Sequence, residues 1–275
     1  MSESLGGELL FYGLLGPLEV SNERETCTPA TPMVRKVLAL LLSRANQIVP
    51  TEVLIDELWG QTPPKSATTT TQTYVYQLRR QLNQHAEEDW LITEPPGYQL
   101  RVSPDQIDTR RFEDLSRRGR QLLDEGEPAE ARPLLREALG MWRGKPLANT
   151  KVGTVLESYV VHLEEQRMRT VELCIEAEAQ LGSYREVIAD LRTLVAQNPL
   201  NEWLHGQLIR ALSHVGRRSE ALQVYQRLQA VLSEELGLDP APELQRLHRE
   251  LLSLGAPPPR QAQPRQFALS CTRPA

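Results

Sequence analysis

The sequence predicts an α+β domain built from short elements, followed by a domain made only of helices. Residues 8–102 change between strand-like and helix-like patterns over short distances, whereas residues 109–254 show helical periodicity without strand signals. A chain of 275 residues is long enough for two such domains. The segment 256–275 contains five prolines and few apolar residues, so it is expected to be a flexible tail.

The first elements of the N-terminal domain are short strands and two helices. Residues 9–20 are rich in strand formers and are interrupted by glycine and proline, which favours short strands with turns. Residues 33–42 carry apolar side chains at helical spacing, with Pro32 at the first helical position. A second helix is expected over 51–59, and Gly60 marks its end.

A third helix and a hairpin complete this domain. The helix is expected to start at a Ser66 cap and to run to about Gln84, with one buried face formed by Thr71, Val75, Leu78 and Leu82. Strand patterns follow at 90–93 and 98–102, and Gly97 in the intervening turn suggests a left-handed conformation. Three helices followed by a hairpin are the outline of a winged helix-turn-helix.

The second half of the chain is predicted to be a tetratricopeptide-like helical domain. Gly182 and Gly216 lie 34 residues apart, and each is followed by a similar pattern of acidic, small and large apolar residues. Thirty-four residues is the tetratricopeptide period. The expected helices are 111–125, 129–142, 155–181, 184–197, 202–215, 219–236 and 242–252.

The distribution of charge is more informative than the net charge of −5. Residues 1–102 hold 8 Lys or Arg and 12 Asp or Glu, and residues 103–255 hold 20 and 24, so neither domain is basic. From residue 61 to residue 85, however, Lys65, Arg79 and Arg80 occur without any acidic residue. This short stretch, with positive charges and no negative ones, coincides with the third helix and is typical of a nucleic-acid contact.

The exposed face of the third helix carries residue types that read DNA. Thr, Gln and Arg side chains hydrogen-bond to base edges and phosphates, and the face opposite Val75 holds Thr69, Thr70, Thr73, Tyr76, Gln77, Arg80 and Gln84. Arg80 points outward and is expected to read a base, whereas Arg79 lies on the flank and is expected to bind a phosphate. A solvated amphipathic helix is the alternative interpretation. Four consecutive threonines disfavour it, since each costs several tenths of a kcal/mol of helix propensity relative to Ala.

The sequence contains no pattern typical of an enzyme, a cofactor site or a metal site. It has no GxxxxGK[ST] phosphate loop, no GxGxxG after a strand, no HExxH and no GxSxG. The three cysteines form no CxxC pair, and no apolar run approaches the length of a membrane span. We therefore expect no catalytic residue, no cofactor and no metal, and a cytoplasmic protein.

Several motifs resemble the Streptomyces antibiotic regulatory protein family. They are Met33-Val34-Arg35-Lys36-Val37-Leu38-Ala39-Leu40-Leu41-Leu42, Leu58-Trp59-Gly60, Gln72-Thr73-Tyr74-Val75-Tyr76-Gln77-Leu78-Arg79-Arg80 and Glu94-Pro95-Pro96-Gly97-Tyr98. The helical half resembles the bacterial transcriptional activation domain of that family, especially in Glu220-Ala221-Leu222-Gln223-Val224-Tyr225 and over residues 233–244. The resemblance covers about residues 8–254, with both halves in the family's order.

The resemblance implies an OmpR-type winged helix that binds promoter DNA and a helical domain that activates transcription. It further implies a pathway-specific activator of an antibiotic biosynthetic cluster, which binds direct repeats and recruits RNA polymerase through its sigma factor. We expect two protomers side by side on such a repeat, with residues 1–102 sufficient for DNA contact. The candidate DNA-binding residues, including the wing, are Thr69, Thr70, Thr73, Tyr74, Tyr76, Gln77, Arg79, Arg80, Thr93, Pro96 and Gly97.

One other function remains open at this point. A helical-repeat adaptor or ligand-sensing protein would also combine a small N-terminal domain with tetratricopeptide-like helices, and it would not bind DNA directly. The acid-free face of the third helix is the feature that favours the DNA-binding interpretation.

Overall fold

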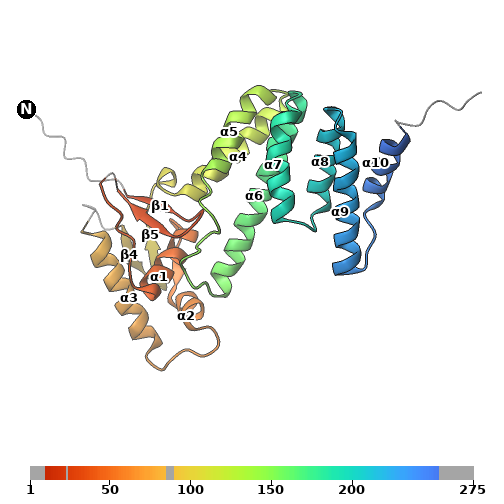
Figure 1. The fold of residues 1–275 in the computed structure, drawn as a ribbon. Helices are drawn as coiled ribbons and strands as arrows, with labels where there is room; N and C mark the ends of the chain where they lie inside the picture. Colours follow the sequence, from red (N-terminus) through yellow and green to blue (C-terminus); the bar gives the residue numbers. More distant parts are fainter. Residues whose placement is uncertain (1–9, 23, 85–89, 254–275) are drawn as a thin grey trace, which may run out of the picture. The chain divides into compact units, whose positions relative to one another are not determined.

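The computed structural model describes residues 10–22, 24–84 and 90–253, which form two compact units (Figure 1). The first unit ends at Leu181 and the second begins at Gly182. The segment 256–275, expected to be a flexible tail, lies outside the described residues. The predicted fold class is confirmed, because a small winged-helix region is followed only by helices.

The first unit combines the winged helix with three further helices. A hairpin of two antiparallel strands precedes the helices, with Tyr12 opposite Val20. The elements of this unit are β1 (Phe11–Gly13), β2 (Glu19–Ser21), α1 (Pro32–Ser43), β3 (Val49–Pro50), α2 (Thr51–Trp59), α3 (Ala67–Leu82), β4 (Leu91–Glu94), β5 (Gly97–Leu100), the 3₁₀ turn η1 (Pro104–Gln106), α4 (Asp108–Asp124), α5 (Pro128–Gly140) and α6 (Thr154–Gln180).

The wing belongs to a three-stranded antiparallel sheet in the order β3-β5-β4. Its third strand, β3, is only two residues long and was not predicted. The expectation of a left-handed Gly97 is wrong, since Gly97 is not among the residues with positive φ. Glycine is needed there for another reason: a Cβ atom at Gly97 would lie 1.9 Å from the carbonyl oxygen of Val49 on β3. Close approach of two strands, rather than turn geometry, selects the glycine.

Helix α1 lies at the centre of the first unit, which explains its nearly continuous apolar sequence. Every residue from Lys36 to Leu42 is buried, because α1 contacts α2, α3, β5 and α6 on different sides. The same core includes Leu147, Leu156 and Val160 from the region after α5. A chain cut at residue 102 would lack these side chains and part of its core. A fragment that tests whether the winged helix suffices for DNA contact should therefore extend through α6 and not end at residue 102.

The second unit consists of antiparallel helices, namely α7 (Tyr184–Gln197), α8 (Glu202–His214), α9 (Arg218–Leu236) and α10 (Pro242–Ser253). Gly182 and Gly216 precede α7 and α9 with φ of 72° and 76°, values that glycine adopts without strain. The 34-residue spacing therefore reflects two equivalent turns. Tyr225 is buried and stacks on His248 of α10 with ring centroids 4.0 Å apart.

A buried carboxylate joins the helix-turn-helix to the helices that follow it. Glu57 of α2 is 1% exposed and accepts hydrogen bonds from the backbone amides of Gly153, Val155 (2.9 Å) and Leu156 (3.1 Å) at the start of α6. Lys36 of α1 lies 3.6 Å from the same carboxylate. Gly153 stands at the N-cap position of α6 without a side chain, so Glu57 performs the capping from another helix.

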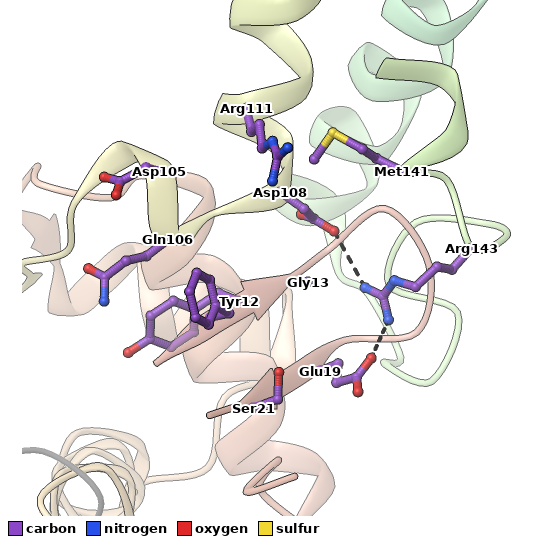
Figure 2. A pocket seen from close by; sticks show the side chains of 11 residues that line it. Tyr12, Gly13, Glu19, Ser21, Asp105, Gln106, Asp108, Arg111, Met141 and Arg143 are labelled. Atoms are coloured by element: carbon purple, nitrogen blue, oxygen red, sulfur yellow. Dashed lines mark hydrogen bonds and ion pairs between the residues drawn. The ribbon is translucent and has the colours of Figure 1, made fainter. Parts of the chain in front are cut away.

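A second carboxylate fixes the β1–β2 hairpin against α4. Asp108 accepts the backbone amides of Leu14 and Leu15 at 2.8 to 3.0 Å. Arg143 lies between Asp108 and Glu19, at 3.4 Å and 2.5 Å (Figure 2). Burial raises the pKa of Asp108 above its ordinary value, against the opposing effect of these hydrogen bonds.

The guanidinium of Arg143 also borders a cavity of about 300 Å³ between the hairpin and α4. A Cβ atom at Gly13 would lie 2.0 Å from the Arg143 guanidinium, so the glycine allows this side chain to rest on β1 (Figure 2). The cavity is bordered by Glu19, Asp108 and Arg143, the charged side chains of the hairpin junction.

We predict that Glu57→Ala lowers the free energy of unfolding by about 3–5 kcal/mol. The substitution removes the acceptor of three backbone amides, of which that of Leu156 is buried, and leaves the buried Lys36 charge without its carboxylate. Urea denaturation measures this change. The matched control is Asp56→Ala on the exposed side of α2, which should change stability by no more than about 0.5 kcal/mol. Equal effects of the two substitutions would contradict the prediction.

Candidate nucleic-acid interface

Helix α3 presents the buried and exposed faces that its periodicity predicts. Thr71, Val75, Leu78 and Leu82 are all buried. Ser66 occupies the N-cap position, but its side chain makes no capping hydrogen bond. The hydroxyl groups of Thr71 and Thr73 instead donate to the carbonyl oxygens of Ala67 (2.9 Å) and Thr69 (3.0 Å), one turn earlier. The threonine run is thus accommodated within the helix.

Most of the candidate residues on α3 share one exposed face. Tyr76 is 63% exposed, and the other exposed members of the set are Thr69, Thr73, Gln77 and Arg80. Thr70 is half-buried on one flank. Tyr74, also half-buried, packs against Trp59 of α2 with ring centroids 6.5 Å apart, so it supports the helix more than it projects from it.

Arg79 connects α3 to the wing. Its Nε donates to the carbonyl oxygen of Leu91 at 2.9 Å, and its Nη2 donates to the hydroxyl of Thr93 at 3.0 Å. Both acceptors are on β4. The guanidinium is therefore oriented by two hydrogen bonds, which use two of its five N–H groups.

The tip of the wing is attached to the start of α2. Pro96 is exposed, and its carbonyl oxygen accepts hydrogen bonds from the amide and the hydroxyl of Thr51, both at 3.2 Å. Thr93 is also exposed, whereas Gly97 is buried between β3 and β4. The structure thus brings Thr93 and Pro96 to the surface and leaves Gly97 as a structural residue.

The structure adds three exposed polar residues to the candidate set. Lys65 and Thr68 lie at the start of α3, and Gln72 lies one turn further along. Gln72 is about 60° from Val75 on the helix wheel, on the same flank as Arg79, and the predicted face stopped short of it. The acid-free stretch from 61 to 85 contains all three, so the charge pattern of the sequence also points to them.

A metal site and a membrane span are not found in the part of the chain that the structure describes. Among those residues, no three His, Cys, Asp or Glu side chains lie close enough to hold a metal ion. None of the helices described is long and apolar enough to cross a membrane. The exposed polar face of α3 and the exposed wing beside it form the candidate site.

A winged helix followed by tetratricopeptide-like helices defines a class of transcriptional regulator. Residues 25–100 match the family described as transcriptional regulatory protein, C terminal, and residues 107–252 match the bacterial transcriptional activator domain. The chain is 36% identical to regulatory protein DnrI of Streptomyces peucetius, over 87% of this chain and 90% of that protein. It belongs to the Streptomyces antibiotic regulatory protein family.

Other relatives in the comparison are longer than this chain. It is 35% identical to regulatory protein AfsR of Streptomyces coelicolor over 88% of its own length, but it spans only 24% of that protein. A solved structure of Mycobacterium tuberculosis EmbR in complex with a low-affinity phosphopeptide superposes with a TM-score of 0.83 at 33% identity. The match covers 90% of this chain and 66% of EmbR, so the winged helix and the helical domain recur together.

We predict that Arg79→Ala loosens the wing without unfolding the protein. Loss of the two hydrogen bonds to β4, each worth about 1 kcal/mol, should speed hydrogen exchange of the β4 amides by tenfold or more. Hydrogen–deuterium exchange with mass spectrometry measures this rate. Arg80→Ala, on the neighbouring exposed position, is the control and should leave β4 unchanged. Identical exchange in both variants would show that Arg79 does not restrain the wing.

Proposed function

We propose that this protein is a sequence-specific activator that binds direct repeats near the promoter of an antibiotic biosynthetic cluster and recruits RNA polymerase. Membership of a family of transcriptional regulators supports the regulatory role. The observation that carries DNA binding is the exposed, acid-free face of α3 beside an exposed wing. The protein acts in the cytoplasm, where it needs no cofactor and performs no catalysis.

In this proposal α3 lies in the major groove. Arg80 makes a bidentate contact with guanine, and Gln77 contacts a neighbouring base edge, since both side chains are exposed at the centre of the polar face. Tyr76, Thr69 and Thr73 contact phosphates and sugars alongside it. Arg79 binds a phosphate with the N–H groups that β4 does not occupy.

Two protomers are required for tight binding. The winged-helix region, residues 1–102, carries a net charge of −4, so its non-specific attraction to DNA is weak. One winged helix contacts one half-site with modest affinity, and a second protomer on the adjacent repeat raises the effective concentration of each contact. Half-sites on one face of the duplex lie about one helical turn apart.

The test is binding of the purified full chain to DNA upstream of its neighbouring genes, over a series of salt concentrations. We expect sequence-specific retardation in gels and an affinity that falls steeply as salt rises. Arg80→Ala and Gln77→Ala should each lower discrimination against random DNA by about 1–3 kcal/mol. Arg79→Ala should weaken binding to all sequences and lower the salt slope by about one.

The outcomes separate the proposal from its rival. Failure of the full chain to bind any duplex selected from a random pool would favour a helical-repeat adaptor without DNA contact. Unchanged specificity of Arg80→Ala would show that this side chain does not face the bases.

A further inference from the structure

The second unit has one end at which apolar side chains are exposed among acidic residues. Leu236 and Leu238 are 53% and 57% exposed where α9 ends, and Leu200 and Trp203 are 38% and 37% exposed where α8 begins. Trp203 is therefore not a core residue, although Leu204 beside it is buried. We call these four residues and the acids around them the acidic–apolar end.

Hydrogen bonds and packing bring the two segments together. The amide of Ala241, in the connection after α9, donates to the carboxylate of Glu202 at 2.6 Å. A Cβ atom on Gly206 of α8 would lie 3.1 Å from the side chain of Leu244 on α10. Figure 1 shows the α7–α8 and α9–α10 connections at the same end of these helices. The exposed leucines and Trp203 therefore belong to one end of the unit.

The exposure of Leu238 belongs to an ordered turn. Gly237 adopts a left-handed conformation with φ of 65°, and the amide of Leu238 donates to the carbonyl oxygen of Leu232 at 3.2 Å. Pro240, two residues later, is buried. The hydrogen bond to Leu232 and the buried Pro240 therefore fix the turn before and after Leu238, whose side chain stays exposed. An ordered, exposed apolar side chain is typical of a residue that anchors an interface.

Acidic residues predominate at this end, and Arg246 of α10 lies 3.8 Å from the carboxylate of Glu243. Residues 198–205 and 230–245 contain no Lys or Arg, and they contain the acidic residues Glu202, Glu234, Glu235, Asp239 and Glu243. Such a surface is repelled by nucleic acid and by anionic membranes. It is also repelled by a second copy of itself. Its complement is a protein surface with exposed apolar side chains and a basic rim.

We propose that the acidic–apolar end is the docking surface for a basic, apolar surface of RNA polymerase holoenzyme. This inference rests on the proposed function, because polymerase is the protein that an activator at a promoter must contact. The apolar side chains supply the contact area, and the acids select a basic partner and speed its association.

The first experiment separates docking from DNA binding in the full chain. The double substitution Leu236→Ser and Leu238→Ser should leave operator affinity within twofold of wild type and lower activated transcription with purified polymerase at least tenfold. Leu252→Ser is the matched control, since Leu252 is 51% exposed near the end of α10, and it should retain both activities. Equal activation by the double variant would overturn the proposal.

The second experiment tests the charge. Glu234→Lys with Glu235→Lys should abolish activation, whereas Glu164→Lys with Glu165→Lys, an exposed acidic pair on α6, should not. A benzophenone crosslinker in place of Leu238 should then join the DNA-bound protein to a polymerase subunit. Crosslinking only to a second copy of this chain would overturn the inference. Absence of activation by the wild-type protein would instead overturn the proposed function itself.

Discussion

The buried carboxylate of Glu57 is the interaction on which the architecture of the first unit depends. It caps α6 from another helix and lies beside Lys36, so α1, α2 and α6 meet at one charged centre inside an apolar core. A buried charge of this kind is stable only when all of its partners are present. The helices of the winged helix and the first helices of the activator domain are therefore parts of one folding unit.

The helices could be predicted from the sequence because long amphipathic segments show a clear 3.6-residue periodicity. The buried face of α3 follows directly from the spacing of its apolar residues. The sequence was not sufficient to predict features that depend on contacts between residues far apart in the chain. The strand β3 exists only because it pairs with β5, and Gly97 is small because Val49 approaches it from that strand. Neither fact has a local signature.

In the candidate interface, too, local features could be predicted from the sequence and contacts between distant elements could not. Residue types and the absence of acids predicted an exposed polar face on α3, and most of the residues predicted for that face are exposed. The sequence did not reveal that Arg79 is bonded to β4 or that Tyr74 packs on Trp59. Both contacts depend on which elements become neighbours in the fold. A helix wheel shows the direction of a side chain, but it does not show what lies there.

The position of Glu57 also bears on how such regulators can be recombined. Its carboxylate belongs to the winged helix, but the amides it binds follow α5, so the boundary between matched sequence families does not coincide with a boundary in packing. A chimaera joined near residue 102 would separate the cap from its helix. A junction between Leu181 and Gly182 keeps the capping pair and the shared core within one parent. For this chain, the unit of exchange is thus larger than the winged helix.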